Sequence, residues 1–254
     1  MCKDERLVLP PLVLIHGWGF NSSVWGSIAP KLKNLYSVVI VDLPGYRSRP
    51  LLKKMTLSTI AADIQQQVES FGVTDKAIWL GWSLGGEVAL QAALDLPDKI
   101  AKLILVAATP KFVQGSGWRE AVKQKVLDDF GRELIKSRDS TIGRFLTLQM
   151  LGVPDSRDLL QKLKISLAEP LQDGALESGL EILNQTDIRS ELQVIDNNID
   201  SPTLWIMGGR DQLVPAAAGV SAADKMNRSN CIVIEAAAHA PFLSHPVEFM
   251  RALL

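Results

Sequence analysis

The sequence predicts an α/β fold with a mostly parallel, doubly wound sheet. Three observations predict it: short apolar runs recur along the chain, helix-like segments separate them, and the composition is that of a globular protein. Of the 254 residues, 47% are hydrophobic and 22% are charged, which allows a substantial buried core. The formal net charge of −1 favours neither nucleic acid nor an anionic membrane as a partner.

Six apolar runs of four or five residues are the candidate strands. Continuous runs rich in Val, Ile and Leu are typical of strands buried on both faces of a parallel sheet. They are Leu12–Ile15, Ser37–Val41, Ala77–Leu80, Leu103–Ala107, Thr203–Met207 and Cys231–Ile234. Helices are expected between them at Leu57–Phe71, Gly85–Leu94 and Pro215–Met226, the first with Thr56 and Ser58 as candidate caps.

One long stretch interrupts this alternation. From about Lys111 to Thr186 we find no convincing strand, and roughly 75 residues is far longer than a usual connection between elements. We interpret residues 111–186 as a helical cap inserted into a core formed by residues 1–110 and 187–254. The cap helices are expected at Trp118–Ile135, Thr141–Leu151, Ser156–Leu167 and Gly174–Asn184.

The segment Gly81–Gly85 reads Gly-Trp-Ser-Leu-Gly and matches the motif G-x-S-x-G. The motif alone is a weak signal, and an ordinary glycine-rich turn is the alternative. Here it lies between a candidate strand and a candidate helix, which is the context of a nucleophile elbow. Glycines fit where such a turn crowds the backbone, and the helix N-terminus favours developing negative charge. Ser83 is therefore the candidate nucleophile.

A serine hydroxyl needs a base to remove its proton, and the chain has only three histidines. In the chain order Ser…Asp…His the base follows the serine, which excludes His16. His239 comes just after the last apolar run, where a loop would lie at the carboxyl edge of the sheet. His245 lies further on, beside Pro246, and is interpreted as a surface or helix-start residue. His239 is therefore the candidate base.

The third member of a triad should follow the preceding strand. Asp211 is the only acidic residue between Gly208 and Pro215. A carboxylate there can hold an imidazole in the required tautomer and stabilise its charged form. The alternative is an aspartate that only caps the next helix.

The loop after the first strand, His16–Gly19, is a candidate half of an oxyanion hole. The backbone N–H of Trp18 and that of Leu84 would donate to the developing oxyanion. His16 is interpreted as a structural residue that fixes this loop through hydrogen bonds. Trp18, Trp82 and Phe145 could line an apolar acyl channel, although ordinary core packing is the alternative.

Four segments resemble those of a known family: His16–Gly19, Asp42–Gly45, Gly81–Gly86 and Ala237–Phe242. They resemble the BioH family of the α/β-hydrolase superfamily, the pimeloyl-[acyl-carrier protein] methyl ester esterases of bacterial biotin synthesis. The cap segments Arg144–Gln149 and Gly179–Leu183 resemble this family too, so the likeness spans most of the chain. It implies the α/β-hydrolase fold with an inserted helical cap.

The resemblance also implies a carboxylesterase that removes the methyl group from the far end of a pimeloyl chain through an acyl-enzyme. It implies a cytoplasmic enzyme that needs no cofactor and no metal, and we expect a monomer. The implied substrate-binding residues are Trp18, Trp82, Ser83, Leu84, Phe145, Leu146, Thr147, Leu148, Gln149 and His239.

The resemblance implies acyl-carrier protein, which is acidic, as the macromolecular partner. Between Arg132 and Lys164 the chain has seven basic and four acidic residues. We therefore expect Arg144 and Arg157 to contact the carrier protein or its phosphopantetheine. The alternative is a solvated helical surface, where mixed charges are normal.

The chain shows no sign of export or membrane insertion. The segment Met1–Arg6 is polar, and the apolar run Leu7–Ile15 is too short to span a bilayer and contains two prolines. Cys2 and Cys231 lack metal or redox spacing, and we expect two free thiols in a reducing cytosol.

Two classes of alternative function remain. The first keeps the triad but changes the substrate: a carbon–carbon hydrolase, a pyruvate-eliminating synthase of menaquinone synthesis, or a general short-chain esterase. The second is a non-catalytic binding module on a hydrolase scaffold.

Overall fold

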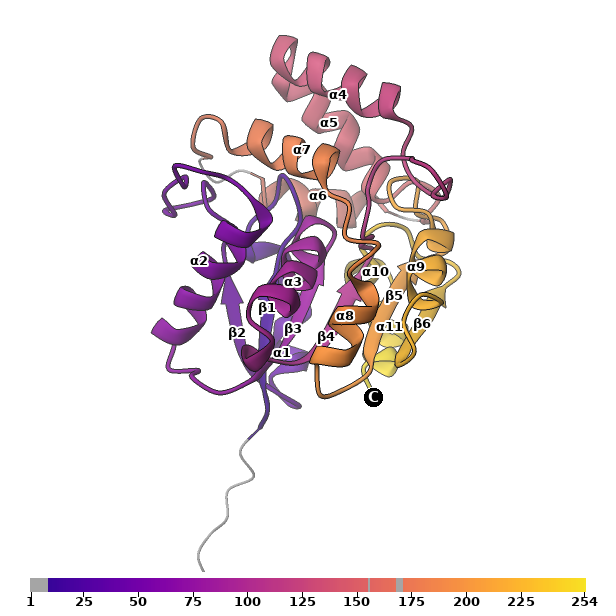
Figure 1. The fold of residues 1–254 in the computed structure, drawn as a ribbon. Coiled ribbons are helices and arrows are strands. Elements are labelled where there is room, and N and C mark those ends of the chain that lie inside the picture. The colour runs from indigo at the N-terminus through magenta and orange to yellow at the C-terminus, as the bar shows by residue number, and fades with distance from the viewer. Residues whose placement is uncertain (1–8, 155, 168–170) are drawn as a thin grey trace, which may run out of the picture.

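The computed structural model describes residues 9–154, 156–167 and 171–254 (Figure 1). Its sheet has six strands in the order β2-β1-β3-β4-β5-β6, and all neighbouring strands are parallel. The strands are β1 (Pro11–Ile15), β2 (Ser37–Val41), β3 (Ala77–Trp82), β4 (Ile100–Val106), β5 (Thr203–Gly208) and β6 (Ser229–Ile234). Each predicted run overlaps one of these strands, so the predicted fold class is confirmed.

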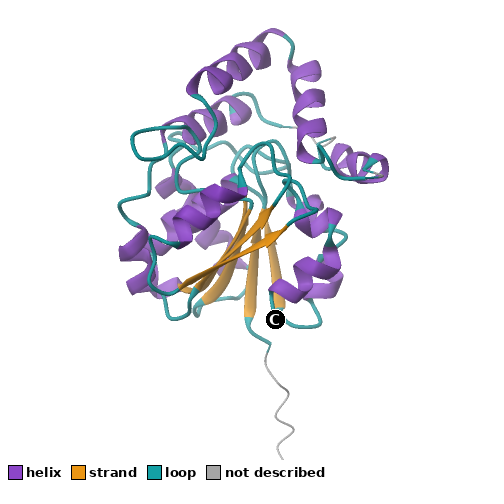
Figure 2. Cartoon of the chain, turned by 90° about the vertical axis from the view of Figure 1, so that its right-hand side faces the viewer, coloured by secondary structure: helices purple, strands orange, loops and turns teal. Residues whose placement is uncertain are grey.

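Helices pack against both faces of the sheet (Figure 2). Alternate strand residues point to opposite faces: Val13 and Ile15 enter one apolar cluster, and Leu12 and Leu14 enter the other. The first cluster includes residues of α2 (Leu57–Ser70), α3 (Leu84–Asp95), α8 (Leu192–Asn198) and α9 (Ala216–Ala223). The second includes residues of the 3₁₀ helix η1 (Ser22–Trp25), α1 (Ala29–Leu32), α10 (Pro241–Ser244) and α11 (Pro246–Ala252).

The order of the strands places the loops that carry the candidate residues together. The chain runs from β1 outward to β2 and then returns to β3 on the other side of β1, with the short 3₁₀ helix η2 (Pro97–Lys99) preceding β4. Open α/β sheets bind ligands at such a switch point, outside the carboxyl ends of the strands. The loops after β1 and β3 therefore lie next to each other at that edge.

Four further helices lie between β4 and β5 in the chain and cover this edge of the sheet (Figure 1). They are α4 (Gln124–Lys136), α5 (Arg138–Gln149), α6 (Arg157–Ile165) and α7 (Ala175–Gln185). The two connections to the rest of the chain are held together. The Ile188 N–H donates to the Pro110 carbonyl at 2.9 Å, and the Lys111 ammonium lies 3.2 Å from the Asp187 carboxylate.

Two helix predictions need correction. The helix expected at 118–135 begins only at Gln124, because Gly115 and Trp118 pair in an isolated bridge and the Trp118 indole N–H donates to the Lys111 carbonyl at 2.9 Å. The short helix α8 was not predicted, although its buried residues Leu192 and Ile195 have helical spacing. At α2 the cap is Thr56 alone, since Ser58 lies inside the helix.

Glu87 in α3 is fully buried, and neither of its carboxylate oxygens has a hydrogen-bond partner among the described residues. Burial raises the pKa of Glu87 well above its usual 4.5, and the nearby Thr186 hydroxyl and Lys111 ammonium offset only part of this shift. The folded protein therefore keeps a proton on Glu87 at pH values where the unfolded chain releases it.

We predict that Glu87 makes the protein less stable as the pH rises above about 4.5, by up to about 1.4 kcal/mol per pH unit until the folded-state pKa is reached. The variant Glu87→Gln should lose this dependence and gain stability relative to the wild type as the pH rises from 5 to 7. Urea unfolding across that range measures it, with the exposed Glu248→Gln as control. Equal slopes for Glu87→Gln and the wild type would contradict the prediction.

Candidate active site

Ser83 lies at the tight turn between β3 and α3, with a φ of 54° and a ψ of −121°. Residues other than glycine rarely adopt a positive φ. The turn is held from outside, because the Ser83 N–H donates to the Val106 carbonyl of β4 at 2.9 Å. A Cβ on Gly81 would collide with the backbone of Gly85, and one on Gly85 would collide with the backbone of Ile15. The sequence motif therefore forms the strained turn of a nucleophile elbow.

His239 and Asp211 meet at the carboxyl edge of the sheet, where they follow β6 and β5. The His239 Nδ1 lies 2.7 Å from the Asp211 Oδ2, and both side chains are buried. The other carboxylate oxygen accepts from the N–H groups of Leu213 and Val214 at 2.8 and 3.0 Å. A carboxylate accepts hydrogen bonds, so Nδ1 carries the proton and Nε2 is left as an acceptor.

Asp211 does not cap helix α9, which was the alternative interpretation. That helix begins at Ala216, and its N-cap residue Pro215 provides no side-chain hydrogen bond. Asp211 instead fixes its own turn with one oxygen and holds His239 with the other.

The backbone of His239 is held from two sides. Its N–H donates to the Gln149 carbonyl of α5 at 3.1 Å, and its carbonyl accepts from the Trp82 indole N–H at 2.8 Å. Trp82 is fully buried, and its ring packs against those of Phe20 and Phe242. The tryptophan beside Ser83 therefore supports the histidine loop from the core and is not part of the cavity lining.

Ser83 and His239 line the same cavity, which has a volume of about 390 Å³. The Ser83 hydroxyl makes no hydrogen bond with the described residues; such bonds are often long in empty sites and tighten when substrate binds. Most of the lining is apolar and includes residues from the loop after β1 and from the segment between β4 and β5, among them Trp18, Phe112, Phe130, Phe145, Leu148 and Leu180.

Of residues 145–149 in α5, only two line this cavity. Phe145 and Leu148 are one helical turn apart and share a face of α5. Leu146 and Gln149 are buried elsewhere, and the Thr147 hydroxyl donates to the Gly143 carbonyl on the exposed side of the helix. Sequence reasoning missed Phe112, Phe130 and Leu180, because an amphipathic pattern does not say what a helix face covers.

The loop after β1 abuts Ser83. A Cβ on Gly17 would lie 3.1 Å from the Ser83 Cβ. Leu84 is the first residue of α3, so its N–H has no partner within the helix. Within the described part of the chain, neither the Trp18 N–H nor the Leu84 N–H has a hydrogen-bond acceptor. The Trp18 indole N–H donates to the Leu176 carbonyl of α7 at 2.8 Å, which joins this loop to that helix.

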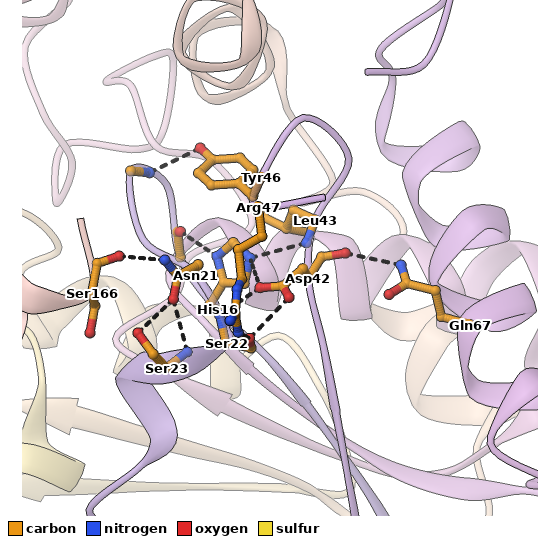
Figure 3. A network of polar contacts seen from close by, with 12 residues as sticks. His16, Asn21, Ser22, Ser23, Asp42, Leu43, Tyr46, Arg47, Gln67 and Ser166 are labelled. Carbon is orange, nitrogen blue, oxygen red and sulfur yellow. Dashed lines mark hydrogen bonds and ion pairs between the residues drawn. The ribbon is translucent and has the colours of Figure 1, made fainter. Parts of the chain in front are cut away.

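His16 fixes the loop through both ring nitrogens (Figure 3). Its Nδ1 donates to the Gly17 carbonyl at 2.9 Å, and its Nε2 accepts from the Leu43 N–H at 3.0 Å. Burial lowers the pKa of His16 to about 4, although the Asp42 carboxylate opposes the shift. This histidine is therefore neutral near pH 7 and has no ring nitrogen left for proton transfer.

The same network holds the rest of the loop (Figure 3). The Asp42 carboxylate accepts from the Ser22 N–H at 2.6 Å and from the Ser22 hydroxyl at 2.9 Å. The Tyr46 hydroxyl accepts from the Gly19 N–H at 3.0 Å. These bonds hold the loop whose Gly17 abuts Ser83.

Other kinds of site are not evident in the described residues. They contain no group of three or more His, Cys, Asp or Glu side chains that could hold a metal ion. No helix among them is both long and apolar enough to cross a membrane. Cys231 is a free thiol whose burial raises its pKa to about 11, and Cys2 lies outside the described residues.

We predict that His16 makes the protein less stable as the pH falls from about 6.5 to about 4. The unfolded chain takes up a proton at the ordinary histidine pKa of 6.5, whereas folded His16 does so only near 4. The loss sums to about 3 kcal/mol over that interval. His16→Gln should be less stable than the wild type at pH 7, and the difference should shrink towards pH 4. Urea unfolding with His245→Gln as control tests this, and a difference that does not change with pH would contradict it.

Comparison with known proteins identifies the family to which this chain belongs. The family model for the alpha/beta hydrolase fold matches residues 10–246. Two proteins named pimeloyl-[acyl-carrier protein] methyl ester esterase, from Xanthomonas oryzae pv. oryzae and Salmonella newport, are each 39% identical over 96% of this chain. The alignments cover 93% and 92% of those two proteins.

Solved structures agree on the fold. An esterase from Exiguobacterium antarcticum matches with a TM-score of 0.87 at 24% identity, over 97% of this chain and 91% of that one. An esterase from a Rhodococcus species matches with a TM-score of 0.76 at 26% identity, over 96% and 89%. The resemblance found in the sequence is confirmed: the chain is a carboxylic ester hydrolase that belongs to the α/β-hydrolase family and, within it, to the family of the pimeloyl-[acyl-carrier protein] methyl ester esterases.

Proposed function

We propose that this chain hydrolyses the methyl ester of a pimeloyl chain carried by acyl-carrier protein, with Ser83 as nucleophile, His239 as base and Asp211 as the residue that orients the base. One observation carries the mechanism: the buried 2.7 Å contact between His239 and Asp211 lies at the cavity that Ser83 also lines. The choice of substrate is supported by the names of the relatives that are 39% identical over nearly the whole chain.

The reaction would proceed through an acyl-enzyme. The Nε2 of His239 takes the proton of the Ser83 hydroxyl, whose oxygen attacks the ester carbonyl. The backbone N–H groups of Trp18 and Leu84 stabilise the tetrahedral oxyanion. The protonated His239 then gives its proton to the departing methoxide, which leaves as methanol, and a water activated by the same imidazole releases the acyl chain as a carboxylate.

The cavity suits an unbranched acyl chain. Its lining is mostly aliphatic and aromatic, so the methylenes of a pimeloyl chain would replace water against apolar surface. The product carboxylate is costly to keep in such surroundings, which favours its release. A carboxylate is also a weak electrophile, so Ser83 would not attack the product again and the reaction would stop after the methyl ester is cleaved.

Residues 111–186 would act as a cap on a core formed by 1–110 and 187–254, and the cap would receive the carrier protein. The Arg144 side chain in α5 is 64% exposed and lies 3.7 Å from the Glu133 carboxylate. Arg157 is the first residue of α6 and is also exposed. Both arginines are thus accessible to an acidic partner and to its phosphopantetheine.

We expect Ser83→Ala to lower kcat for methyl pimeloyl-carrier protein by at least ~10³-fold, and Asp211→Asn to lower it by ~10²- to 10⁴-fold, as losses within a catalytic triad generally do. Methanol release measures both. A fluorophosphonate should label wild-type Ser83 but not Ser83→Ala. If the folded wild type were not labelled, the non-catalytic binding module would be favoured. If it cleaved a diketone but no ester, a carbon–carbon hydrolase would be favoured.

We expect the double variant Arg144→Glu/Arg157→Glu to raise KM for the carrier-linked ester at least tenfold more than KM for a small methyl ester, because reversed charges repel an acidic partner. Arg251→Glu, an exposed site on α11, is the matched control. Steady-state kinetics on both substrates decides the matter, and an equal loss on both would refute the docking role.

A further inference from the structure

Lys123 is the one charged residue among the described residues that line the cavity shared by Ser83 and His239. Apart from it, Ser83, His239 and Gln212, the lining side chains are aliphatic or aromatic. In an apolar site, isolated polar groups are the ones that set orientation and specificity. The positive charge of Lys123, an exposed residue of the lining, therefore bears on what the cavity accepts.

The backbone of Lys123 is fixed while its side chain has no partner. Lys123 is the N-cap residue of α4, and its carbonyl accepts from the Val126 N–H at 2.9 Å. Its side chain makes no hydrogen bond or ion pair with the described residues. The first turn of α4 contains no acidic residue and the N-cap side chain makes no capping bond, so no carboxylate of that turn neutralises the positive charge.

Neighbouring basic residues of the cap differ from Lys123 in this respect. The Lys125 ammonium lies 2.8 Å from the Asp129 carboxylate, Arg132 pairs with the same aspartate, and Arg144 lies near Glu133. Lys125 is two positions away on the same helix, but it does not line the cavity. These three cations are paired with carboxylates, whereas the lysine that lines the cavity is not.

We propose that Lys123 is a specificity-determining residue that selects esters whose acyl chain carries an anionic group beyond the methylenes. This rests on the part of the proposed function that makes Ser83 the nucleophile. An ester carbonyl at Ser83 and an anion near Lys123 would occupy one cavity, with the methylenes on the apolar wall between them. Two anions have this chemistry: the free carboxylate of a half-ester and the phosphate of a phosphopantetheine arm.

The test compares charged and neutral esters of the same acyl chain. Monomethyl pimelate is an anion at pH 8, whereas dimethyl pimelate is neutral. For Lys123→Gln, KM for the half-ester should rise about tenfold more than KM for the diester, with kcat for the half-ester changed less than twofold. Lys123→Arg should restore most of the preference, and Lys125→Gln is the matched control that should leave it unchanged. Equal changes on both esters, or no change on either, would exclude the carboxylate as the group that Lys123 binds, and the proposal would then require discrimination of the phosphate in a second pair of substrates.

A second pair of substrates distinguishes the two anions. Methyl pimeloyl thioesters of pantetheine and of phosphopantetheine differ only in the phosphate. If Lys123→Gln raised KM more for the phosphopantetheine thioester than for the pantetheine thioester, and raised it equally for the half-ester and the diester, the phosphate would be the group that Lys123 binds. Discrimination in the ester pair would identify the carboxylate. If Lys123→Gln discriminated within both pairs as the wild type does, this role of Lys123 would be overturned.

Binding measured without turnover separates this proposal from the catalytic one. Titration calorimetry of monomethyl pimelate into Ser83→Ala, and into Ser83→Ala/Lys123→Gln, should give a Kd about tenfold higher for the double variant. Added salt should weaken binding to Ser83→Ala more than binding to the double variant, because screening acts on the ion pair. If the wild type failed to cleave esters while this difference persisted, the proposed reaction would fail and the anion site would stand. Equal Kd values would overturn carboxylate binding at Lys123 and leave the proposed reaction unaffected.

Discussion

The hydrogen bond between His239 and Asp211 depends on the parallel pairing of β5 and β6. In a parallel pair both strands end at the same edge, so the loops after them can exchange side-chain contacts although 28 residues separate the two in the chain. The rest of the site is arranged around this contact. Asp211 is fixed by backbone N–H groups, and the His239 backbone is held by Trp82 from the core and by Gln149 from α5.

Two buried histidines show how partners decide what an imidazole can do. In His16 both ring nitrogens are occupied by backbone groups, and burial lowers the pKa to about 4. In His239 a carboxylate occupies Nδ1, while Nε2 is left as an acceptor on the side of the cavity. The first arrangement suits a structural residue, and the second suits a proton acceptor. The loop that His16 holds is also the one that brings Gly17 against Ser83.

The helices between β4 and β5 give the site its apolar wall. They provide Phe130, Phe145 and Leu180, and the Trp18 ring packs edge-on against the first two of these. Lys125, Arg132 and Arg144 of the same helices pair with carboxylates and do not line the cavity, whereas Lys123 does. An apolar enclosure with a single cation can distinguish substrates by length and charge without any change in the catalytic residues.

The sequence by itself determined the strands, the elbow at Ser83 and the positions of Asp211 and His239 after their strands. These features depend on local patterns: continuous apolar runs, a turn that tolerates only glycine at its crowded positions, and polar residues directly after a strand. The fold class and the family followed from them.

Only the tertiary structure decided which side chains line the cavity and which support it. Trp82 adjoins the serine in sequence but is buried behind the histidine loop, and Phe112 and Phe130 carry no motif yet form the wall. Likewise, Glu87 is buried and Lys123 lies at the cavity because of what packs around their helices. The physical reason is that periodicity determines which residues share a face, whereas the contacts made by that face depend on chain segments far away in the sequence.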